Sequence, residues 1–232
     1  MKTDLKGKIA VVTGAAGTMG RAVVNAFSGE GIKTIGIDVK PSANGIVCDI
    51  TDPAAVEKAI RDIGKVDILV NNAGILSNNK SEATSPDEWR KVLGANLDGA
   101  FYLARAVIPG MKERRWGRIV NTCSLAAKTG GLTAGTAYSA SKGALTSLTF
   151  SLARELAAFG ITVNGISPAY VNTPMVTEQL TEAQRQAVLA QIPVGRFCEP
   201  EEFAHVVRFL VSPLSGFITG EIVDLNGGVI MD

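Results

Sequence analysis

The chain alternates short runs of β-branched residues with longer stretches whose apolar residues recur at helical spacing. Runs such as Ile9–Val12 and Thr34–Ile37 are typical of buried strands, and Gly20–Gly29 between them is typical of an amphipathic helix. The same alternation predicts further strands at Gly45–Cys48, Ile68–Val70, Arg118–Thr122, Thr162–Ile166 and Ile222–Asp224. It predicts further helices over Ala54–Ile63, Pro86–Glu113, Tyr138–Phe159, Glu182–Gln191 and Pro200–Val211. This order of elements predicts a parallel sheet with helices on both faces, a three-layer α/β/α fold.

The connection between the second and third strands departs from this pattern. Only Val39 to Gly45 separate the strand that ends at Asp38 from Ile46, whereas a parallel crossover usually contains a dozen or more residues and a helix. Pro41, Asn44 and Gly45 disfavour a helix further. We therefore predict that a short loop replaces the helix here.

Length and composition indicate one α/β domain over residues 1–232, since the chain shows no internal repeat and no linker. The 23 basic and 22 acidic residues nearly cancel, which argues against a nucleic-acid or membrane-surface partner. The sequence lacks a secretory signal and a long apolar span, so we expect a cytoplasmic protein. Cys48, Cys123 and Cys198 are widely separated and His205 is the only histidine; we expect reduced thiols and no metal site.

The first strand runs into a glycine-rich turn, Thr13–Gly20, that opens a helix. Such a turn, with Gly14 and Gly20 here, lets backbone N–H groups approach a pyrophosphate closely. Asp38 ends the second strand 18 residues after Gly20, where a carboxylate can bind ribose hydroxyls and repel a 2′-phosphate. The pattern therefore favours NAD(H) over NADP(H), although Lys40 is close enough in sequence to bind a 2′-phosphate if the loop folds back.

Polar residues follow two further strands of the predicted sheet. Asp49 comes directly after the third strand, and Asn71-Asn72-Ala73-Gly74 follows the fourth. Ligands bind at the carboxyl edge of open parallel sheets, which favours a binding role for Asn72, Ala73 and Gly74. Turn formation alone is the alternative interpretation of these four residues.

A candidate reactive group lies later in the chain. Tyr138 and Lys142 are four residues apart at the start of a predicted helix, so they share one helix face. A positive charge beside a phenol favours its ionised form and thus proton exchange near neutral pH. Ser124 follows the fifth strand and can hydrogen-bond the oxygen on which negative charge develops when a carbonyl is reduced.

Taken together, Thr13–Gly20, Asn71–Gly74, Ser124, Tyr138 and Lys142 resemble the short-chain dehydrogenase/reductase family over essentially the whole chain. The segments Ile192–Phe197, Glu199–Glu202 and Ser215–Glu221 are similar to its 3-oxoacyl-[acyl-carrier-protein] reductase branch. The resemblance implies a Rossmann-like, doubly wound parallel sheet and an enzyme that uses a nicotinamide cofactor.

The resemblance also implies roles for individual residues. Ser124, Tyr138, Lys142 and Asn96 match the family's catalytic set, and Gly94 and Gly99 around Asn96 suit an irregular, water-admitting turn. The residues that match the family's cofactor contacts are Gly14, Thr18, Met19, Gly20, Asp38, Asp49, Ile50, Asn72, Ala73, Gly74, Tyr138, Lys142, Pro168, Val171 and Thr173. Asp49 and Ile50 correspond to contacts with the adenine. Thr18 and Ala169 depart from the family pattern, since glycine is usual at both places.

The hypothesis from the sequence is an oxidoreductase that transfers hydride between NAD(H) and a carbonyl or secondary alcohol, with Tyr138 as general acid and base. An NADPH-dependent 3-oxoacyl thioester reductase is the first alternative, and a non-catalytic NAD(H)-binding subunit is the second. We expect residues 170–195 to cover the substrate. Five residues can line the pocket or fill the core of that cover: Leu125, Leu132, Met175, Val176 and Leu180.

The surface leaves two points open. Arg105, Lys112, Arg114 and Arg115 can form a docking patch for an acidic carrier, or only a solvated helix end. The resemblance implies a homotetramer that pairs the two longest helices and the C-terminal strand. Leu145, Leu148, Leu152 and Leu156 fit such a buried helix face, but burial inside one subunit predicts the same pattern.

Overall fold

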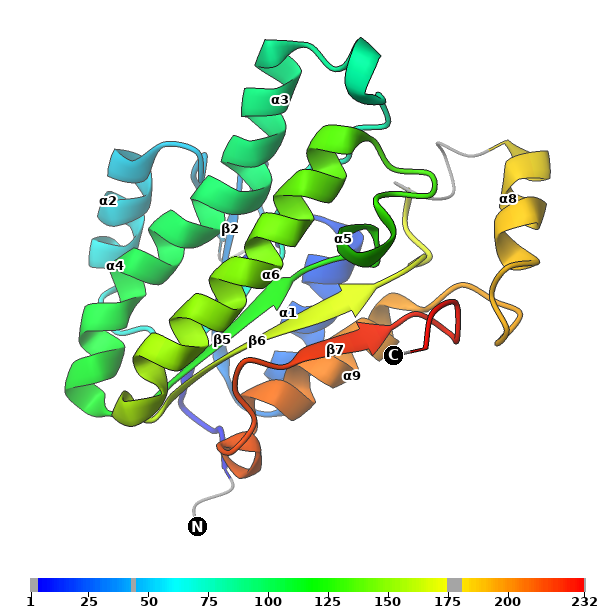
Figure 1. The fold of residues 1–232 in the computed structure, drawn as a ribbon. Coiled ribbons are helices and arrows are strands. Elements are labelled where there is room, and N and C mark those ends of the chain that lie inside the picture. The colour runs from blue at the N-terminus through cyan, green and yellow to red at the C-terminus, as the bar shows by residue number, and fades with distance from the viewer. Residues whose placement is uncertain (1–3, 43–44, 175–180, 232) are drawn as a thin grey trace.

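The computed structural model describes residues 4–42, 45–174 and 181–231, and the strands of these residues form one parallel sheet (Figure 1). The sheet has the order β3-β2-β1-β4-β5-β6-β7. Its strands are β1 (Ile9–Thr13), β2 (Lys33–Asp38), β3 (Gly45–Val47), β4 (Ile68–Asn71), β5 (Gly117–Thr122), β6 (Ile161–Pro168) and β7 (Ile222–Leu225). Each predicted strand is present within two residues of its predicted ends, and the predicted parallel arrangement is confirmed.

Helices cover both faces of the sheet, which confirms the three-layer α/β/α fold (Figure 1). Helices α1 (Thr18–Gly29) and α9 (Pro200–Val211) pack on one face, and α2 (Pro53–Ile63), α4 (Gly99–Arg114) and α6 (Thr136–Leu156) pack on the other. Successive side chains of a strand point to opposite faces. Accordingly Val11 belongs to the core under α2 and α4, whereas its neighbour Val12 belongs to the core under α1.

Capping residues explain several helix starts. The Asp52 carboxylate accepts hydrogen bonds from the backbone N–H groups of Ala54 and Ala55 at the start of α2. Helix α8 (Glu182–Leu189) starts with the Thr181 hydroxyl bound to the N–H of Gln184. The described chain also contains four short helical segments: η1 (Ser81–Ala83), α5 (Ala126–Thr129), η3 (Ala157–Phe159) and η4 (Pro213–Ser215).

The helix predicted over Pro86–Glu113 is present, but its regular geometry is interrupted once. The structure has α3 (Pro86–Leu93), a wide π-helical turn η2 (Gly94–Asp98), and then α4. Glycine disfavours the regular helix, and Gly99 is required by packing, because a Cβ there would lie 2.6 Å from Cδ1 of Ile50. The irregular turn expected around Asn96 is therefore present, within a path that otherwise continues from α3 into α4.

The connection between β2 and β3 is short, as predicted. Its described residues, Val39–Ser42, contain no helix, and β3 pairs directly with β2 through Asp38 and Val47. Gly36 and Gly45 lie opposite each other in this pairing. The short connection therefore places β3 directly beside β2, with no helix between the two strands in the described residues.

The strand order places a topological switch between β1 and β4. From β1 the chain moves outward to β2 and β3, and it then returns to β4 on the other side of β1. The carboxyl ends of β1 and β4 thus diverge into loops on opposite faces, which is where open α/β sheets bind ligands. None of the helices in the described ranges has the length and apolar character needed to cross a bilayer.

Candidate active site

The glycine-rich turn after β1 has the geometry that a bound pyrophosphate requires. Gly14 has a φ of +64°, in the left-handed region that glycine adopts without strain. A Cβ on Gly20 would overlap the carbonyl oxygen of Gly14, so the turn and α1 are packed as closely as backbone allows. Gly17 precedes α1 and no side chain caps its N-terminus. The first-turn N–H groups, at Thr18 and Met19, are therefore available to an anion.

Asp38 lies beside this turn, at the end of β2. One carboxylate oxygen accepts a hydrogen bond from the N–H of Ala16 at 2.9 Å, and the other accepts from the N–H of Lys40 at 3.0 Å. Gly36 lets the two segments meet, because a Cβ there would lie 2.7 Å from Cβ of Ala15. The negative charge is thereby fixed next to the turn that would hold the phosphates.

Thr13 joins the ends of β1 and β4. Its hydroxyl accepts hydrogen bonds from the N–H groups of Asn72 at 3.0 Å and Ala73 at 2.9 Å, and the Asn72 side chain donates to the carbonyl of Thr13 at 2.9 Å. This network holds Asn72, Ala73 and Gly74 against the glycine-rich turn. Thr13 was not among the site residues that the sequence suggested; its place at the strand end was the available signal.

Asp49 and Ile50 follow β3. Asp49 is exposed and one of its oxygens accepts from both the N–H and the hydroxyl of Thr51, at 2.9 and 2.8 Å. Ile50 is buried against Gly99 in the core. The structure therefore places Asp49 at the surface, and most of Ile50 is already covered by protein.

Tyr138 and Lys142 lie on one face of α6, as their spacing predicts. The Lys142 ammonium is 5.7 Å from the centroid of the Tyr138 ring, and the side chain is only 3% exposed. The ammonium donates a hydrogen bond of 2.6 Å to the backbone carbonyl of Thr122, the last residue of β5. A buried cation is thus held between the helix and the sheet edge, directly beside a phenol.

Ser124 shares a cavity with Tyr138. Ser124 is 8% exposed, and its hydroxyl oxygen accepts a hydrogen bond from the N–H of Ala126 at 3.1 Å. The cavity is lined by Leu76, Ser124, Leu125, Ala126, Thr129, Gly131, Leu132, Thr133, Ala134, Tyr138, Ala169 and Tyr170. Leu125 and Leu132 line it, one of the two alternatives that the sequence left open, whereas Met175, Val176 and Leu180 lie outside the described residues. The hydroxyl groups of Ser124 and Tyr138 thus border a cavity whose described lining combines leucine and alanine side chains with further hydroxyl-bearing residues and contains no charged side chain.

Asn96 lies in the π-helical turn and is 1% exposed. Its side-chain oxygen accepts from the N–H of Ile75 at 2.8 Å, and its amide nitrogen donates to the carbonyl of Ile75 and the hydroxyl of Ser141, both at 3.0 Å. The Ser141 hydroxyl in turn donates to the carbonyl of Tyr138 at 2.7 Å. A continuous chain of hydrogen bonds thus connects Asn96 to the backbone of Tyr138. Sequence reasoning missed Ser141, which lies inside the Tyr138–Lys142 motif.

The segment after β6 borders the same cavity. Pro168 is buried and its carbonyl accepts from the N–H of Leu125 at 3.1 Å. Val171 is buried and forms an isolated parallel bridge with Cys198, and Thr173 is half-buried. The segment is therefore fixed on one side by the loop after Ser124 and on the other by residues that precede α9.

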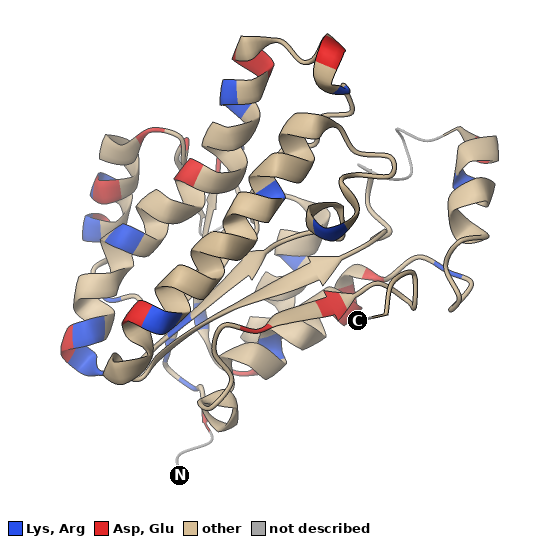
Figure 2. Cartoon of the chain, viewed as in Figure 1, with Lys and Arg blue, Asp and Glu red and all other residues tan. Residues whose placement is uncertain are grey.

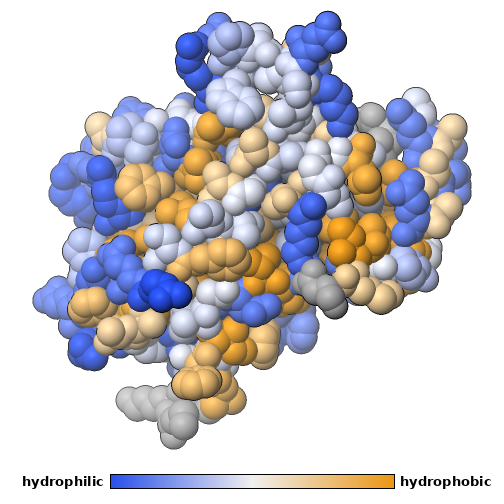
Figure 3. Space-filling model, in the orientation of Figure 1, coloured by the Kyte–Doolittle hydropathy of each residue, from blue (hydrophilic) through white to orange (hydrophobic). Residues whose placement is uncertain are grey.

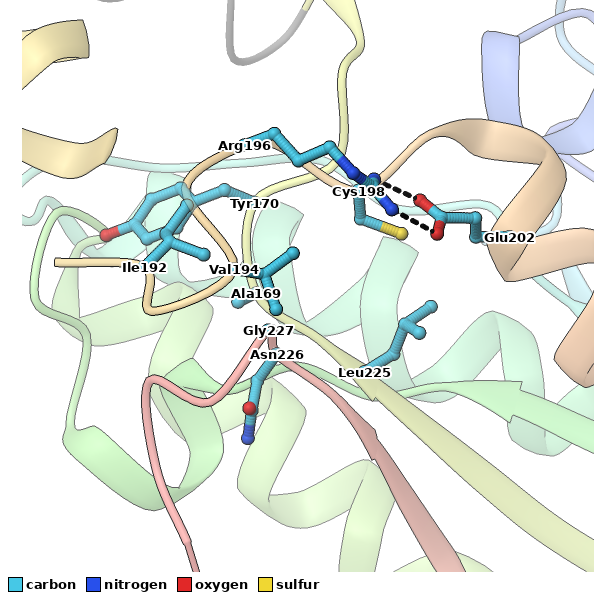
Figure 4. A pocket seen from close by; sticks show the side chains of 10 residues that line it. All are labelled: Ala169, Tyr170, Ile192, Val194, Arg196, Cys198, Glu202, Leu225, Asn226 and Gly227. Carbon is cyan, nitrogen blue, oxygen red and sulfur yellow. Dashed lines mark hydrogen bonds and ion pairs between the residues drawn. The ribbon is translucent and has the colours of Figure 1, made fainter. Parts of the chain in front are cut away.

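A second cavity lies behind this segment (Figure 4). Its lining residues are Ala169, Tyr170, Ile192, Val194, Arg196, Cys198, Glu202, Leu225, Asn226 and Gly227. At one end Arg196 and Glu202 form a two-pronged ion pair with N–O distances of 2.6 and 2.7 Å, and this pair lowers the pKa of Glu202 to about 2. Ala169 and Tyr170 border both cavities, so this segment forms a wall between them.

The basic residues considered as a docking patch form ion pairs and backbone contacts, and those at the end of α4 lie far from this site. Arg105 pairs with Glu57 and Lys112 with Glu155, while Arg114 and Arg115 donate to backbone carbonyls. Arg115 precedes β5 by two residues, at the strand's amino end, whereas Ser124 follows its carboxyl end. Six strand residues separate the two ends by about 20 Å. Figure 2 shows basic and acidic residues side by side where α4 ends.

No group of metal-ligating side chains occurs among the residues that the structure describes. His205 is exposed on α9, and the thiols of Cys48, Cys123 and Cys198 are all free. Burial raises the pKa of each of the three thiols. The chemistry of the site therefore rests on hydroxyl, phenol, amide and ammonium groups.

Comparisons with known proteins agree over the length of the chain. Residues 14–230 match the family profile described as Enoyl-(Acyl carrier protein) reductase. The chain is 40% identical over 245 aligned residues to the 3-oxoacyl-[acyl-carrier-protein] reductase of Vibrio cholerae, covering 98% of this chain and 99% of that protein.

Two solved structures of similar chains contain a bound nicotinamide cofactor. A 3-oxoacyl-[acyl-carrier protein] reductase from Brucella melitensis with bound NAD matches with a TM-score of 0.91 at 35% identity, covering 98% of this chain and 92% of that one. A putative NAD(P)-dependent gluconate 5-dehydrogenase from Beutenbergia cavernae with bound NADP matches with a TM-score of 0.92 at 32% identity, covering 99% of each chain. The likeness thus extends to proteins with either cofactor.

Proposed function

The chain belongs to the short-chain dehydrogenase/reductase family, and from this premise we propose that Tyr138 is the general acid and base of its reaction and that NAD(H) is its preferred cofactor. As a member of that family the protein is an oxidoreductase that transfers hydride between a nicotinamide cofactor and a carbonyl/alcohol pair. The observation that carries the proposal is the buried Lys142 ammonium beside the Tyr138 ring, at the cavity that Tyr138 shares with Ser124.

The residues at the sheet edge fit a dinucleotide. The tight contact of Gly20 with Gly14 leaves backbone, and no side chain, on the surface that a pyrophosphate would approach. The uncapped start of α1 offers N–H donors to its charge. When bound, such a cofactor supplies hydride in reduction and accepts it in oxidation. We assign Gly14, Thr18, Met19 and Gly20 to the phosphates, and Asn72, Ala73 and Gly74 to the adjoining wall.

Side chains of the protein itself donate and accept the proton of the reaction. In reduction the Ser124 hydroxyl and the Tyr138 phenol both donate hydrogen bonds to the substrate oxygen, which gains negative charge as hydride reaches the carbon. Tyr138 then gives up its proton to that oxygen, and the Lys142 ammonium stabilises the phenolate that remains. Asn96 and Ser141 hold Tyr138 and its helix turn in place. Oxidation of an alcohol follows the same steps in reverse.

Asp38 supports the preference for NAD(H). Its carboxylate is fixed by the N–H groups of Ala16 and Lys40, and a 2′-phosphate in this position would meet a negative charge that cannot turn away freely. Ribose hydroxyls, in contrast, can donate to it. We also assign the adenine to the region of Asp49 and Ile50, and the nicotinamide to Pro168, Val171 and Thr173.

For the substrate we propose a ketone or secondary alcohol with apolar substituents. The described lining around Ser124 and Tyr138 includes three leucine and three alanine side chains, and no charged residue is among them. A 3-oxoacyl thioester is the second candidate, which the Vibrio cholerae relative favours. We propose that residues 170–195 cover the substrate, supported by the small hydrophobic cluster of Val188, Ile192 and Phe197, which packs with Tyr170.

For the assembly and the location we propose a homotetramer in the cytoplasm. Leu145, Leu152 and Leu156 are buried within this one chain, so they give no support for pairing. The exposed aromatic residues do: Phe101 lies on α4, Phe150 on α6 and Phe209 on α9, and Phe217 precedes β7. Figure 3 shows apolar side chains at the surface over α4 and α6. The free thiols suit a reducing compartment. Light scattering on the purified protein measures the assembly, and a monomer would refute it.

The test of the function is a steady-state assay with NADH and NADPH, and with NAD⁺ and NADP⁺ in the other direction, on ketones, 3-oxoacyl thioesters and secondary alcohols. We expect turnover, and we expect Tyr138→Phe to reduce kcat by about 10²- to 10⁴-fold, the usual contribution of a positioned acid or base. The dissociation constant of NADH, measured by fluorescence, should stay unchanged. A protein that binds NADH but turns over no substrate would instead be a non-catalytic binding subunit.

A further inference from the structure

Lys80 contacts the wall of the substrate cavity through two backbone carbonyls. Its ammonium donates hydrogen bonds to the carbonyl of Gly131 at 3.0 Å and to that of Ala134 at 2.6 Å. Gly131, Leu132, Thr133 and Ala134 all line the cavity that contains Ser124 and Tyr138. A residue more than 50 positions away in sequence thus binds the turn that faces the substrate.

This turn has little regular structure of its own. Residues 130–135 belong to no helix or strand, and Gly130 and Gly131 have φ values of +71° and +84°. Consecutive left-handed glycines let the chain reverse sharply, but they also leave it many alternative conformations. A charged donor that satisfies two carbonyls at once restricts those conformations.

The backbone beneath Lys80 is itself firmly held. Its carbonyl accepts from the N–H of Ala83 and from both the N–H and the hydroxyl of Thr84, each at 3.0 Å. The neighbouring Asn79 side chain donates to Glu88 of α3 at 2.8 Å, and Ser77 donates to the other oxygen of the same carboxylate. Lys80 therefore extends from a fixed base toward a turn that belongs to no helix or strand.

The same two segments also meet at the start of α6. The N–H of Gly135 donates to the carbonyl of Ser77 at 2.7 Å, and that of Thr136 donates to the carbonyl of Asn79 at 3.1 Å. No side chain caps α6, so these backbone bonds define where the helix of Tyr138 begins. The two hydrogen bonds of Lys80 hold the residues that come just before these in the chain, on the part of the turn that borders the cavity.

We infer that Lys80 is a positioning residue that sets the width of the substrate cavity by holding Gly131 and Ala134, and that it thereby determines which substrates fit. The inference rests on the proposed function, since it takes the cavity at Tyr138 as the substrate site. It predicts an effect on substrate selectivity rather than on the proton transfer itself, because Lys80 contacts the wall and neither Tyr138 nor Ser124.

The test compares Lys80→Met, which keeps the length of the side chain and removes its donors, with Lys91→Met, which alters an exposed lysine on α3. The substrates are ethyl 3-oxobutanoate and ethyl 3-oxooctanoate, which share the reacting group and differ in chain length. For Lys80→Met we expect the ratio of kcat/KM between the two esters to change by about tenfold, because a wall displaced by about 1 Å misplaces the larger substrate. The kcat for the short ester and the affinity for NADH should stay at the wild-type values.

Two further measurements separate positioning from general damage. Hydrogen exchange of the amides in residues 129–136 should be faster in Lys80→Met than in the wild type and in Lys91→Met. Aminoethylation of Lys80→Cys with bromoethylamine rebuilds a side chain of nearly the same length with an ammonium, and it should restore the wild-type ester ratio; treated wild-type protein is the control.

The inference is overturned if the ester ratio of Lys80→Met equals that of the wild type, or if both esters lose kcat equally and aminoethylation restores neither. Unchanged exchange in residues 129–136 overturns it as well. Failure of the proposed function is a different result, namely a wild-type protein that reduces neither these esters nor any other carbonyl of the panel.

Discussion

The ammonium of Lys142 lies 2.6 Å from the backbone carbonyl oxygen of Thr122, to which it donates a hydrogen bond. The bond connects α6 to the carboxyl end of β5, two residues before Ser124. A cation that is almost fully buried is stable only where polar groups compensate for its lost hydration. Here the Thr122 carbonyl provides such a polar group, and the Lys142 ammonium that it holds lies beside the Tyr138 ring.

Removal of this ammonium should therefore abolish most of the activity. We expect Lys142→Met to lower kcat by about 10²- to 10⁴-fold, since the phenolate loses its stabilising charge. The Thr122 carbonyl loses its donor, so the free energy of unfolding should fall by about 1–3 kcal/mol. Steady-state kinetics and urea unfolding measure the two effects. Lys58→Met, at an exposed ion pair with Asp62, is the control and should match the wild type; near-normal kcat in Lys142→Met would contradict the assignment.

The cofactor preference should depend on the charge at position 38. For Asp38→Asn we expect the ratio of kcat/KM for NADPH to that for NADH to rise by about tenfold, the factor that ~1.4 kcal/mol of removed repulsion produces. Asparagine retains an oxygen that can accept from the N–H of Ala16. Asp38→Ser removes the charge and also shortens the side chain, and it should change the ratio in the same direction. If neither variant alters the ratio, Asp38 only fixes the end of β2.

Ser141 should matter for the reaction although it faces no substrate. Ser141→Ala breaks the link between Asn96 and the carbonyl of Tyr138. We expect about a tenfold loss of kcat from the looser helix turn, with a loss of about 1–3 kcal/mol in unfolding free energy, because buried polar groups lose partners. The pH profile of kcat should shift in position. A variant that unfolds more easily but keeps the wild-type kcat and pH profile would show that Ser141 is purely structural.

The thiol of Cys198 should react only in alkaline solution. Burial raises its pKa to about 11, with a further contribution from Glu202. Because the thiolate is the reactive form, only about one thiol in a thousand is ionised at pH 8. We expect slow alkylation by iodoacetamide at pH 8 and a rate that climbs tenfold per pH unit up to about 11, with Cys198→Ser as the control. Rapid labelling of Cys198 at pH 8 would contradict this environment.

The same shift has a consequence for stability. The pKa of the Cys198 thiol in the folded protein lies above the ordinary value of 9.0 that the thiol has in an unfolded chain. The raised pKa of Cys198 therefore contributes fully to the free energy of unfolding below about pH 9, and this contribution is lost as the pH rises toward about 11. Unfolding free energies of the wild type and Cys198→Ser, measured across this range, should differ in slope with the wild type falling more steeply.

Local patterns predicted most of the fold because strands and helices leave a signature in consecutive residues. The alternation of β-branched runs and amphipathic stretches located each strand of the described sheet, and the bounds of α9 agree with the predicted Pro200–Val211. At Gly94–Asp98 the apolar spacing continued through a π-helical turn, which only the glycines around Asn96 had indicated. A tertiary contact explains the glycine that follows this turn, because Ile50, from a distant segment, occupies the space that a side chain at position 99 would need.

The sequence by itself determined which chemistry the chain carries, because Tyr138 and Lys142 share a helix face by spacing alone and the glycine-rich turn is local. Only the tertiary structure decided how those groups are held. The bond from Lys142 to Thr122, the bridge from Asn96 through Ser141, and the contact of Lys80 with Gly131 and Ala134 all join segments 20 or more residues apart. Such contacts depend on how separate elements pack, and packing brings together atoms whose proximity no local pattern encodes.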